Sequence, residues 1–209
     1  MTILIFGDSV TYGAWDQAGG WADRVKRFVH QRVIEQDKYH LIYNLGVSGD
    51  NTAYLLERFP RDVAARVEPN EDVAIVFDIG ANDRQFSNKT KKFRITPEEF
   101  QANISRLAEE AKKITKNVAF MGLVPVDDKK VDPIPWKPDS SYKNSYISKF
   151  DVILKSVCKA KKLKYIDQGK VFSGKGYEKL LADGVHPNTA GHEKIAEVVF
   201  EEFIKWGWI

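Results

Sequence analysis

A serine that follows the first apolar stretch of the chain is placed to act as a nucleophile. Ser9 lies in the segment FGDSVTYG, where a Gly-Asp-Ser turn comes directly after the apolar residues Ile3–Phe6. A serine hydroxyl attacks a carbonyl carbon efficiently only when a base removes its proton. Gly, Asp and Ser also favour turns for conformational reasons alone, so a turn without chemistry is the alternative. A histidine placed to act as this base would favour the catalytic interpretation over the plain turn.

One of the four histidines stands in a loop that suits such a base. His186 lies in DGVHPN, with Asp183 three residues before it. A carboxylate that accepts a hydrogen bond from one imidazole nitrogen leaves the other nitrogen free to take a proton. The other three histidines are better explained by packing or by surface exposure: His30, His40 and His192. We therefore predict that Ser9 is the nucleophile, His186 the base and Asp183 the acid that orients it.

The same chemistry needs fixed hydrogen-bond donors for the negative charge that develops on the carbonyl oxygen. The backbone N–H groups of Ser9 and Gly49 suit this purpose, since glycine lets the backbone approach a ligand closely. The side-chain amide of Asn82, in the segment GAND, is a third candidate donor. These groups form the predicted oxyanion hole.

The elements that must position these residues alternate along the chain. Short apolar runs predict strands over residues 3–6, 41–45, 73–79, 118–123 and 164–166. Amphipathic stretches predict helices over residues 21–34, 52–67, 97–114, 144–160 and 189–203. Continuously apolar strands that alternate with helices are typical of a parallel sheet covered on both faces. We therefore predict a doubly wound α/β fold with a five-stranded parallel sheet, in one domain over residues 1–209.

The polar loops that follow these strands should meet at one edge of the sheet, because ligands of such folds bind at the carboxyl ends of the strands. The longest irregular stretch is residues 126–142, which is rich in proline and aspartate. We predict that it forms a surface loop without a helix.

Four of these loops, in their order along the chain, resemble the sequence blocks of the SGNH-hydrolase superfamily, also called GDSL esterases and lipases. They are FGDSVTYG, NLGVSGDNT, GAND and DGVHPN, and together they span residues 6–188. Val10 stands where a leucine gives the GDSL motif its name, and this apolar exchange leaves the candidate catalytic residues unchanged.

The resemblance implies the same catalytic roles that the residue types and their positions indicate. It makes Ser9 the nucleophile, His186 the base and Asp183 its partner, with Gly49 and Asn82 completing the oxyanion hole. It also implies a flavodoxin-like three-layer α/β/α sandwich and a two-step acyl transfer that needs no metal and no cofactor.

Residues beside these blocks receive supporting or binding roles. We expect Asp8 to hold the nucleophile turn through an Asx-type hydrogen bond and Asp83 to brace the loop around Asn82. Three aromatic residues could line a substrate pocket, or could simply pack the loops: Tyr12, Trp15 and Trp136.

Composition limits the partners and the location of the protein. Its 32 Lys and Arg against 29 Asp and Glu leave a net charge of only +3, and the basic residues are scattered, which argues against nucleic-acid binding. No apolar run approaches the length of a membrane span, and the start MTILIFG lacks the features of a signal peptide. We expect a cytoplasmic protein without stable membrane insertion, whose single cysteine, Cys158, is buried. The oligomeric state stays open.

Several other functions fit parts of this pattern. A phosphotransferase of the haloacid-dehalogenase type also carries an aspartate after its first strand, but it needs a second acid where this chain has Val10. An acyltransferase would use the same triad as a hydrolase, and a catalytically silent ester- or carbohydrate-binding module would keep the same fold. No long apolar insertion that could form a lipid-binding lid is present, which favours small esters with short-chain acyl or acetyl groups.

Overall fold

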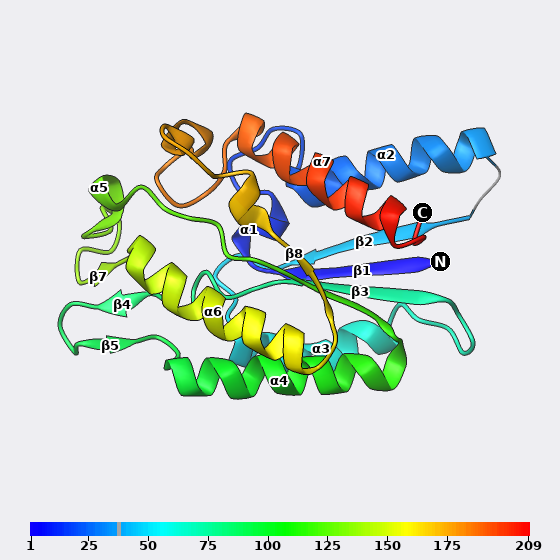
Figure 1. Cartoon of the computed structure of the whole chain (residues 1–209), viewed down its shortest axis with the longest axis horizontal. Helices are drawn as coiled ribbons and strands as arrows, with labels where there is room; N and C mark the ends of the chain where they lie inside the picture. The colour runs from blue at the N-terminus through cyan, green and yellow to red at the C-terminus, as the bar shows by residue number, and fades with distance from the viewer. Residues whose placement is uncertain (37–38) are drawn as a thin grey trace.

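Five parallel strands form the central sheet, in the order β2-β1-β3-β6-β8 (Figure 1). The computed structural model describes residues 1–36 and 39–209. The strands are β1 (Thr2–Gly7), β2 (Leu41–Gly46), β3 (Val73–Asp78), β6 (Asn117–Met121) and β8 (Lys164–Ile166). Counted along the chain, this order is the 2-1-3-4-5 arrangement of flavodoxin-like folds, in which ligands bind outside the carboxyl ends of the first and third strands. The predicted α/β class and five-stranded parallel sheet are confirmed.

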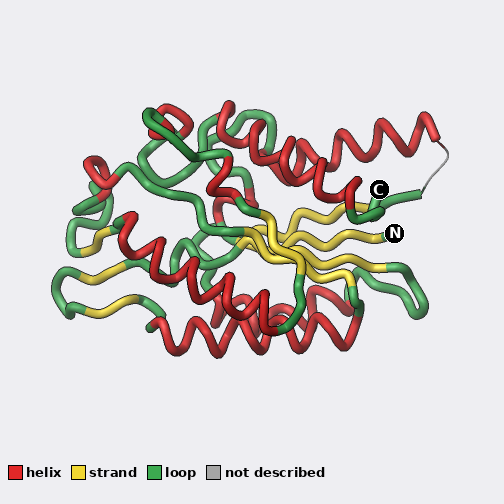
Figure 2. The backbone as a smooth tube through the Cα atoms, in the orientation of Figure 1, coloured by secondary structure: helices red, strands yellow, loops and turns green. Residues whose placement is uncertain are grey.

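Helices cover both faces of the sheet (Figure 2). One layer consists of α2 (Gly20–Gln36) and α7 (Thr189–Lys205), and the other of α3 (Thr52–Ala64), α4 (Pro97–Ile114) and α6 (Asn144–Ala160). Because successive side chains of a strand point to opposite faces, Ile3 and Ile5 pack under the first layer and Leu4 and Phe6 under the second. All four side chains are fully buried, so both faces of β1 read as apolar in the sequence.

Side-chain caps begin the long helices directly after the polar loops. The Asn51 side chain accepts hydrogen bonds from two N–H groups in the first turn of α3, and Asn188 does the same once for α7. Thr96 and Glu99 form a reciprocal capping box at the start of α4. The caps fix where each loop ends and its helix starts.

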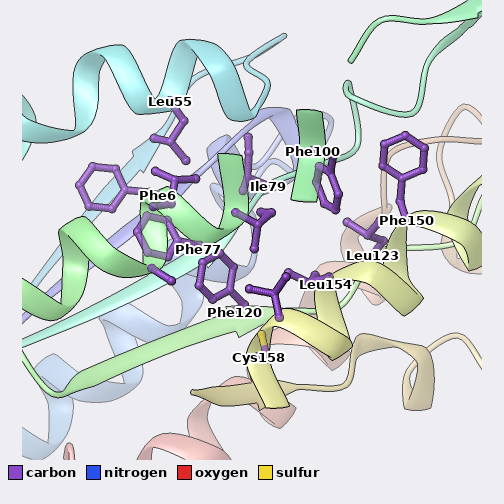
Figure 3. Close-up of a cluster of buried hydrophobic side chains, with 14 of the residues drawn as sticks. Phe6, Leu55, Phe77, Ile79, Phe100, Phe120, Leu123, Phe150, Leu154 and Cys158 are labelled. Carbon is purple, nitrogen blue, oxygen red and sulfur yellow. The ribbon is translucent and has the colours of Figure 1, made fainter. Parts of the chain in front are cut away.

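A row of phenylalanines holds the central strands together (Figure 3). The Phe77 ring of β3 lies 5.8 Å from the ring of Phe6 and 4.7 Å from the ring of Phe120, between centroids. Burying one such side chain contributes about 1.5–3 kcal/mol to folding. Cys158 of α6 is buried in the same layer, as predicted. This packing sets the relative height of the strand ends that carry the polar loops.

The stretch 126–142 differs from the loop predicted for it. It contains α5 (Asp128–Val131) and β7 (Ser140–Ser141), and β7 pairs in antiparallel fashion with β4 (Phe86–Ser87), which pairs with β5 (Lys92–Phe93). The prediction of an irregular surface loop was wrong here, because two-residue strands and one-turn helices are too short for a periodic apolar pattern. Val131 and Ile134 are fully buried and anchor this segment to the core.

Three further short elements lie outside the predicted set: α1 (Ser9–Tyr12) and the 3-10 turns Gln168–Lys170 and Tyr177–Leu180. Helix α3 ends at Ala64 rather than at residue 67. No helix in the described ranges is both long enough and apolar enough to cross a bilayer.

Candidate active site

Ser9 is the first residue of α1, a single helical turn that follows β1. The Asp8 side chain caps this turn by accepting a hydrogen bond from the Val10 N–H at 3.0 Å, the bond expected of an Asx turn. Gly46, at the end of β2, lets α1 lie against the sheet, because a Cβ there would be 2.2 Å from a backbone nitrogen of the turn. Ser9 is thus fixed at the carboxyl end of a central strand.

The structure brings Ser9, His186 and Asp183 into one hydrogen-bonded row. Ser9 Oγ lies 2.9 Å from His186 Nε2, and His186 Nδ1 lies 2.7 Å from Asp183 Oδ2. The other carboxylate oxygen, Asp183 Oδ1, accepts hydrogen bonds from the backbone N–H groups of Val185 and His186, both at 2.9 Å. In this arrangement the imidazole can take the serine proton as the oxygen attacks a carbon.

The charge of Asp183 fixes the tautomer of the imidazole. Burial opposes ionisation of this carboxyl, but the side-chain and backbone hydrogen bonds from His186 hold its pKa below the ordinary value. An ionised carboxylate only accepts hydrogen bonds, so His186 Nδ1 carries the proton and Nε2 presents its lone pair to Ser9.

Trp15 contacts the same carboxylate from outside. Its indole Nε1–H donates to Asp183 Oδ2 at 2.8 Å, and its ring meets the His186 ring edge-on at 5.8 Å between centroids. The backbone of Trp15 has a φ of 67°, in the left-handed region that bulky residues rarely adopt. Sequence analysis assigned Trp15 only to the pocket, and no spacing signal links it to a carboxylate 168 residues away.

The candidate oxyanion donors lie on three different loops. Gly49 has a φ of 83°, and nothing lies within 4 Å of where its Cβ would be, so its backbone faces open space. Within the described ranges, the N–H groups of Ser9 and Gly49 have no acceptor. Asn82 Nδ2 donates one hydrogen to the Asp50 carbonyl at 2.8 Å, which leaves its second N–H available. Tyr142 OH donates to Asn82 Oδ1 at 3.3 Å and so holds the amide in this orientation.

Asp83 fastens the Asn82 loop to the start of α3. Its buried carboxylate accepts hydrogen bonds from the Thr52 N–H at 3.2 Å and from Thr52 Oγ1 at 2.5 Å. Burial raises the pKa of Asp83 to about 6, although the bonds from Thr52 oppose that rise. The contact joins the second and third polar loops.

A buried cluster of titratable side chains lies behind Ser9. It consists of Asp8, Asp78 and Arg84, all nearly inaccessible to solvent. Burial, together with the neighbouring Asp78, raises the pKa of Asp8 to about 8. Asp78 accepts hydrogen bonds from three side chains: Thr11, Trp21 and Gln168. Arg84 favours the ionised forms of both carboxyls through its charge, and its Nη2 donates to the Val124 carbonyl at 2.9 Å.

A cavity of about 860 Å³ opens beside His186. The three aromatic candidates from the sequence, Tyr12, Trp15 and Trp136, all line it, and each side chain is more than half exposed. Ser48 and Asp183 also contribute to the wall. The cavity thus reaches His186, whose Nε2 lies 2.9 Å from Ser9 Oγ, and its aromatic walls suit a small organic ligand.

Comparison with known proteins places this site in a family. The model of the GDSL-like Lipase/Acylhydrolase family matches residues 5–194, which include all four polar loops. The chain belongs to this family. As a member of the GDSL-like family it is a carboxylic ester hydrolase.

Relatives of the GDSL-like family align over most of the chain. Esterase TesA of Pseudomonas aeruginosa is 22% identical over 200 residues, covering 95% of this chain and 86% of the relative. The isoamyl acetate-hydrolyzing esterase 1 homolog of Rattus norvegicus is 22% identical over 200 residues, covering 91% and 76% of the two chains. The crystal structure of a lipase/acylhydrolase from Enterococcus faecalis superposes with a TM-score of 0.75 at 24% identity, over 98% of this chain and 96% of the other. This structural likeness shows the shared fold.

Proposed function

We propose that the protein is a serine esterase that hydrolyses small carboxylic esters, with acetyl and other short acyl groups, through an acyl-enzyme on Ser9. The observation that carries this proposal is the unbroken hydrogen-bonded row from Ser9 Oγ through His186 to Asp183, at 2.9 and 2.7 Å. Family membership supports the reaction class.

The reaction runs in two steps. Ser9 Oγ attacks the ester carbonyl carbon while His186 Nε2 takes its proton, and the carbonyl oxygen becomes negatively charged. This oxygen accepts hydrogen bonds from the N–H groups of Ser9 and Gly49 and from the Asn82 amide. His186 then gives its proton to the leaving alcohol. In the second step a water, deprotonated by the same imidazole, attacks the acyl-enzyme and releases the acid.

The cavity beside His186 supports a preference for short acyl groups. Its apolar wall comes from side chains at the surface, mainly Tyr12, Trp15 and Trp136, while Val131 and Ile134 are withdrawn into the core. One relative is named for the hydrolysis of isoamyl acetate, an acetyl ester, and this name agrees with the preference. A long acyl chain would find little apolar surface to cover it.

Covalent labelling tests the proposal. A fluorophosphonate should add one label to the wild-type protein, as measured by intact mass, and none to Ser9→Ala. Ser48→Ala is a matched control, since Ser48 lines the same cavity without a contact to His186, and it should label fully. Full labelling of Ser9→Ala, or no labelling of the wild-type protein, would contradict the proposal and would favour a silent binding module.

A further inference from the structure

A second hollow, of about 380 Å³, lies beside the antiparallel strands β4, β5 and β7. Four basic side chains line it, together with a single acidic one, Asp139. The basic residues come from two segments: Lys89, Lys92 and Arg94 lie in or next to the β4–β5 hairpin, and Lys137 lies shortly before β7. We call this hollow the basic groove. Its lining carries three more positive than negative charges.

The cations of the basic groove are only partly balanced by nearby acidic groups, since Asp139 lines the groove and Arg94 acts electrostatically on Asp50 and Asp83. None of the four cations forms an ion pair within the described part of the chain. Arg94 instead lies over the ring of Tyr54, 5.6 Å from its centroid, and Lys137 Nζ donates to the side-chain oxygen of Gln85 at 2.5 Å. A concave surface with unpaired cations attracts anions and concentrates the field between its walls.

The walls of the basic groove are held by backbone hydrogen bonds. Ser87 pairs with Ser140 across β4 and β7, and the Asn88 N–H donates to the Asp139 carbonyl at 2.7 Å. Gln85, which anchors Lys137, is itself buried. Because these segments are already fixed, less conformational entropy is lost when the cations become ordered around a ligand.

The basic groove adjoins the catalytic cavity. Trp136 lines the catalytic cavity, and its chain neighbour Lys137 lines the basic groove. A row of hydrogen bonds also leads from the groove to the candidate oxyanion donor Asn82, from Gln85 Nε2 to Tyr142 OH at 3.1 Å and from Tyr142 OH to Asn82 Oδ1 at 3.3 Å. The groove therefore lies on the oxyanion side of the candidate site.

We propose that the basic groove binds an anionic group, a carboxylate or a phosphate, of an ester substrate whose ester bond lies in the catalytic cavity. The inference rests on the proposed function and narrows it to esters that carry a negative charge away from the scissile bond. Lysine ammonium groups act as point charges, so they bind a carboxylate or a phosphate without a strict geometric preference.

Matched neutral and anionic esters test this inference. The acetyl esters 4-acetoxybenzamide and 4-acetoxybenzoate differ by one charge on the alcohol side, and phenyl butyrate and phenyl hydrogen succinate differ by one on the acyl side. For at least one pair, the wild-type protein should have the lower KM for the anionic ester. That preference should weaken at high salt, because exposed charges are screened.

The double variant Lys89→Gln/Lys92→Gln should raise KM for the preferred anionic ester about threefold to tenfold, at constant kcat. It should leave the kinetics on the neutral ester unchanged. The control Lys116→Gln/Lys175→Gln removes the same charge from two exposed lysines outside the groove and should change neither. Equal effects of the two double variants, or no preference for either anionic ester, would overturn the inference while activity on neutral esters kept the proposed function intact.

Inorganic phosphate distinguishes a substrate subsite from a site for a free anion. In a substrate subsite, phosphate competes with the anionic ester and has no effect on the neutral one. If phosphate instead changes kcat for the neutral ester in the wild-type protein but not in Lys89→Gln/Lys92→Gln, the groove is an effector site, and the inference is overturned. If the wild-type protein cleaves none of these esters, the proposed function itself is contradicted.

Discussion

The Asn82 side chain is held between two partners, the Asp50 carbonyl and the Tyr142 hydroxyl, and this leaves one amide N–H free. If that N–H binds the transition-state oxyanion, Asn82→Ala should lower kcat about 10²–10³-fold and change KM little. Steady-state kinetics on an aryl acetate measure both constants. Asn88→Ala, which removes an amide from the neighbouring hairpin, should keep near-normal kcat. A similar kcat for both variants would make Asn82 a structural loop residue.

The Trp15 indole and the His186 imidazole donate to the same oxygen of Asp183. Trp15→Phe keeps an aromatic wall but removes one donor, so it should lower kcat about threefold to tenfold, as expected for one hydrogen bond. Steady-state kinetics on an aryl acetate measure this loss. Trp136→Phe, which lacks this contact, should alter KM only. An unchanged kcat in Trp15→Phe would limit Trp15 to the pocket wall.

Sequence alone pointed to Ser9, His186 and Asp183, because their short motifs combine chemistry-bearing residue types with the turns that present them. It could not find the bond between Trp15 and Asp183, or the cluster of Asp8, Asp78 and Arg84. Those contacts join residues far apart in the chain and depend on how loops settle against each other, for which no periodic signal exists.

Some helices and strands can likewise be predicted from the sequence, and others cannot. All five sheet strands and all five long helices were predictable: the helices and four of the strands are long enough for their apolar pattern to repeat, and the three-residue β8 continues the alternation of strands and helices. The strands β4, β5 and β7 were not, because pairing of two-residue strands is fixed by tertiary contacts such as the burial of Ile134. These unpredicted elements carry the basic groove.

The close packing of α1 on the end of β2 should make both stability and catalysis sensitive to the side chain at position 46. In Gly46→Ala the added Cβ would overlap backbone atoms of α1, so the turn must shift and carry Ser9 away from His186. We expect a loss of about 1–3 kcal/mol in the free energy of unfolding and a lower kcat. Denaturant unfolding and steady-state kinetics measure the two effects. Gly169→Ala, whose nearest obstacle is a flexible Asp167 side chain, should keep its kcat, and a normal kcat in Gly46→Ala would show that α1 tolerates displacement.

The stability of the whole molecule should depend on pH through the buried pair behind Ser9. The pKa of Asp8 is about 8 in the folded protein, above the value of about 3.9 in an unfolded chain. Between these values the folded state binds more protons, so this group stabilises the fold at low pH, and its contribution falls as pH rises towards 8. Asp8→Asn keeps a capping side chain without a titrating group and should lose less stability from pH 5 to pH 8 than the wild-type protein. Thermal unfolding across this range measures the difference, and identical slopes would contradict the assignment.

Acyl-chain preference is also a property of the whole molecule, because it depends on what surrounds the catalytic cavity. Each methylene that a pocket buries adds about 0.8 kcal/mol to binding, so a deep tunnel would make kcat/KM climb with acyl length. The cavity wall here is a rim of exposed aromatic side chains, and we expect a maximum between acetyl and butyryl. Matched aryl esters of two to twelve carbons measure the trend. A maximum at eight carbons or beyond would require an acyl-binding groove that the exposed rim does not supply.

The hydrogen bond between Ser9 and His186 joins residues that lie 177 positions apart in the sequence. During synthesis on the ribosome, β1 emerges before β2 and β3, the two strands that flank it in the sheet. The nucleophile meets its base only after residue 186 has left the exit tunnel and the loop before α7 has docked. A chain that stops before residue 186 therefore carries Ser9 without its proposed base, and under the proposed mechanism it should not cleave esters.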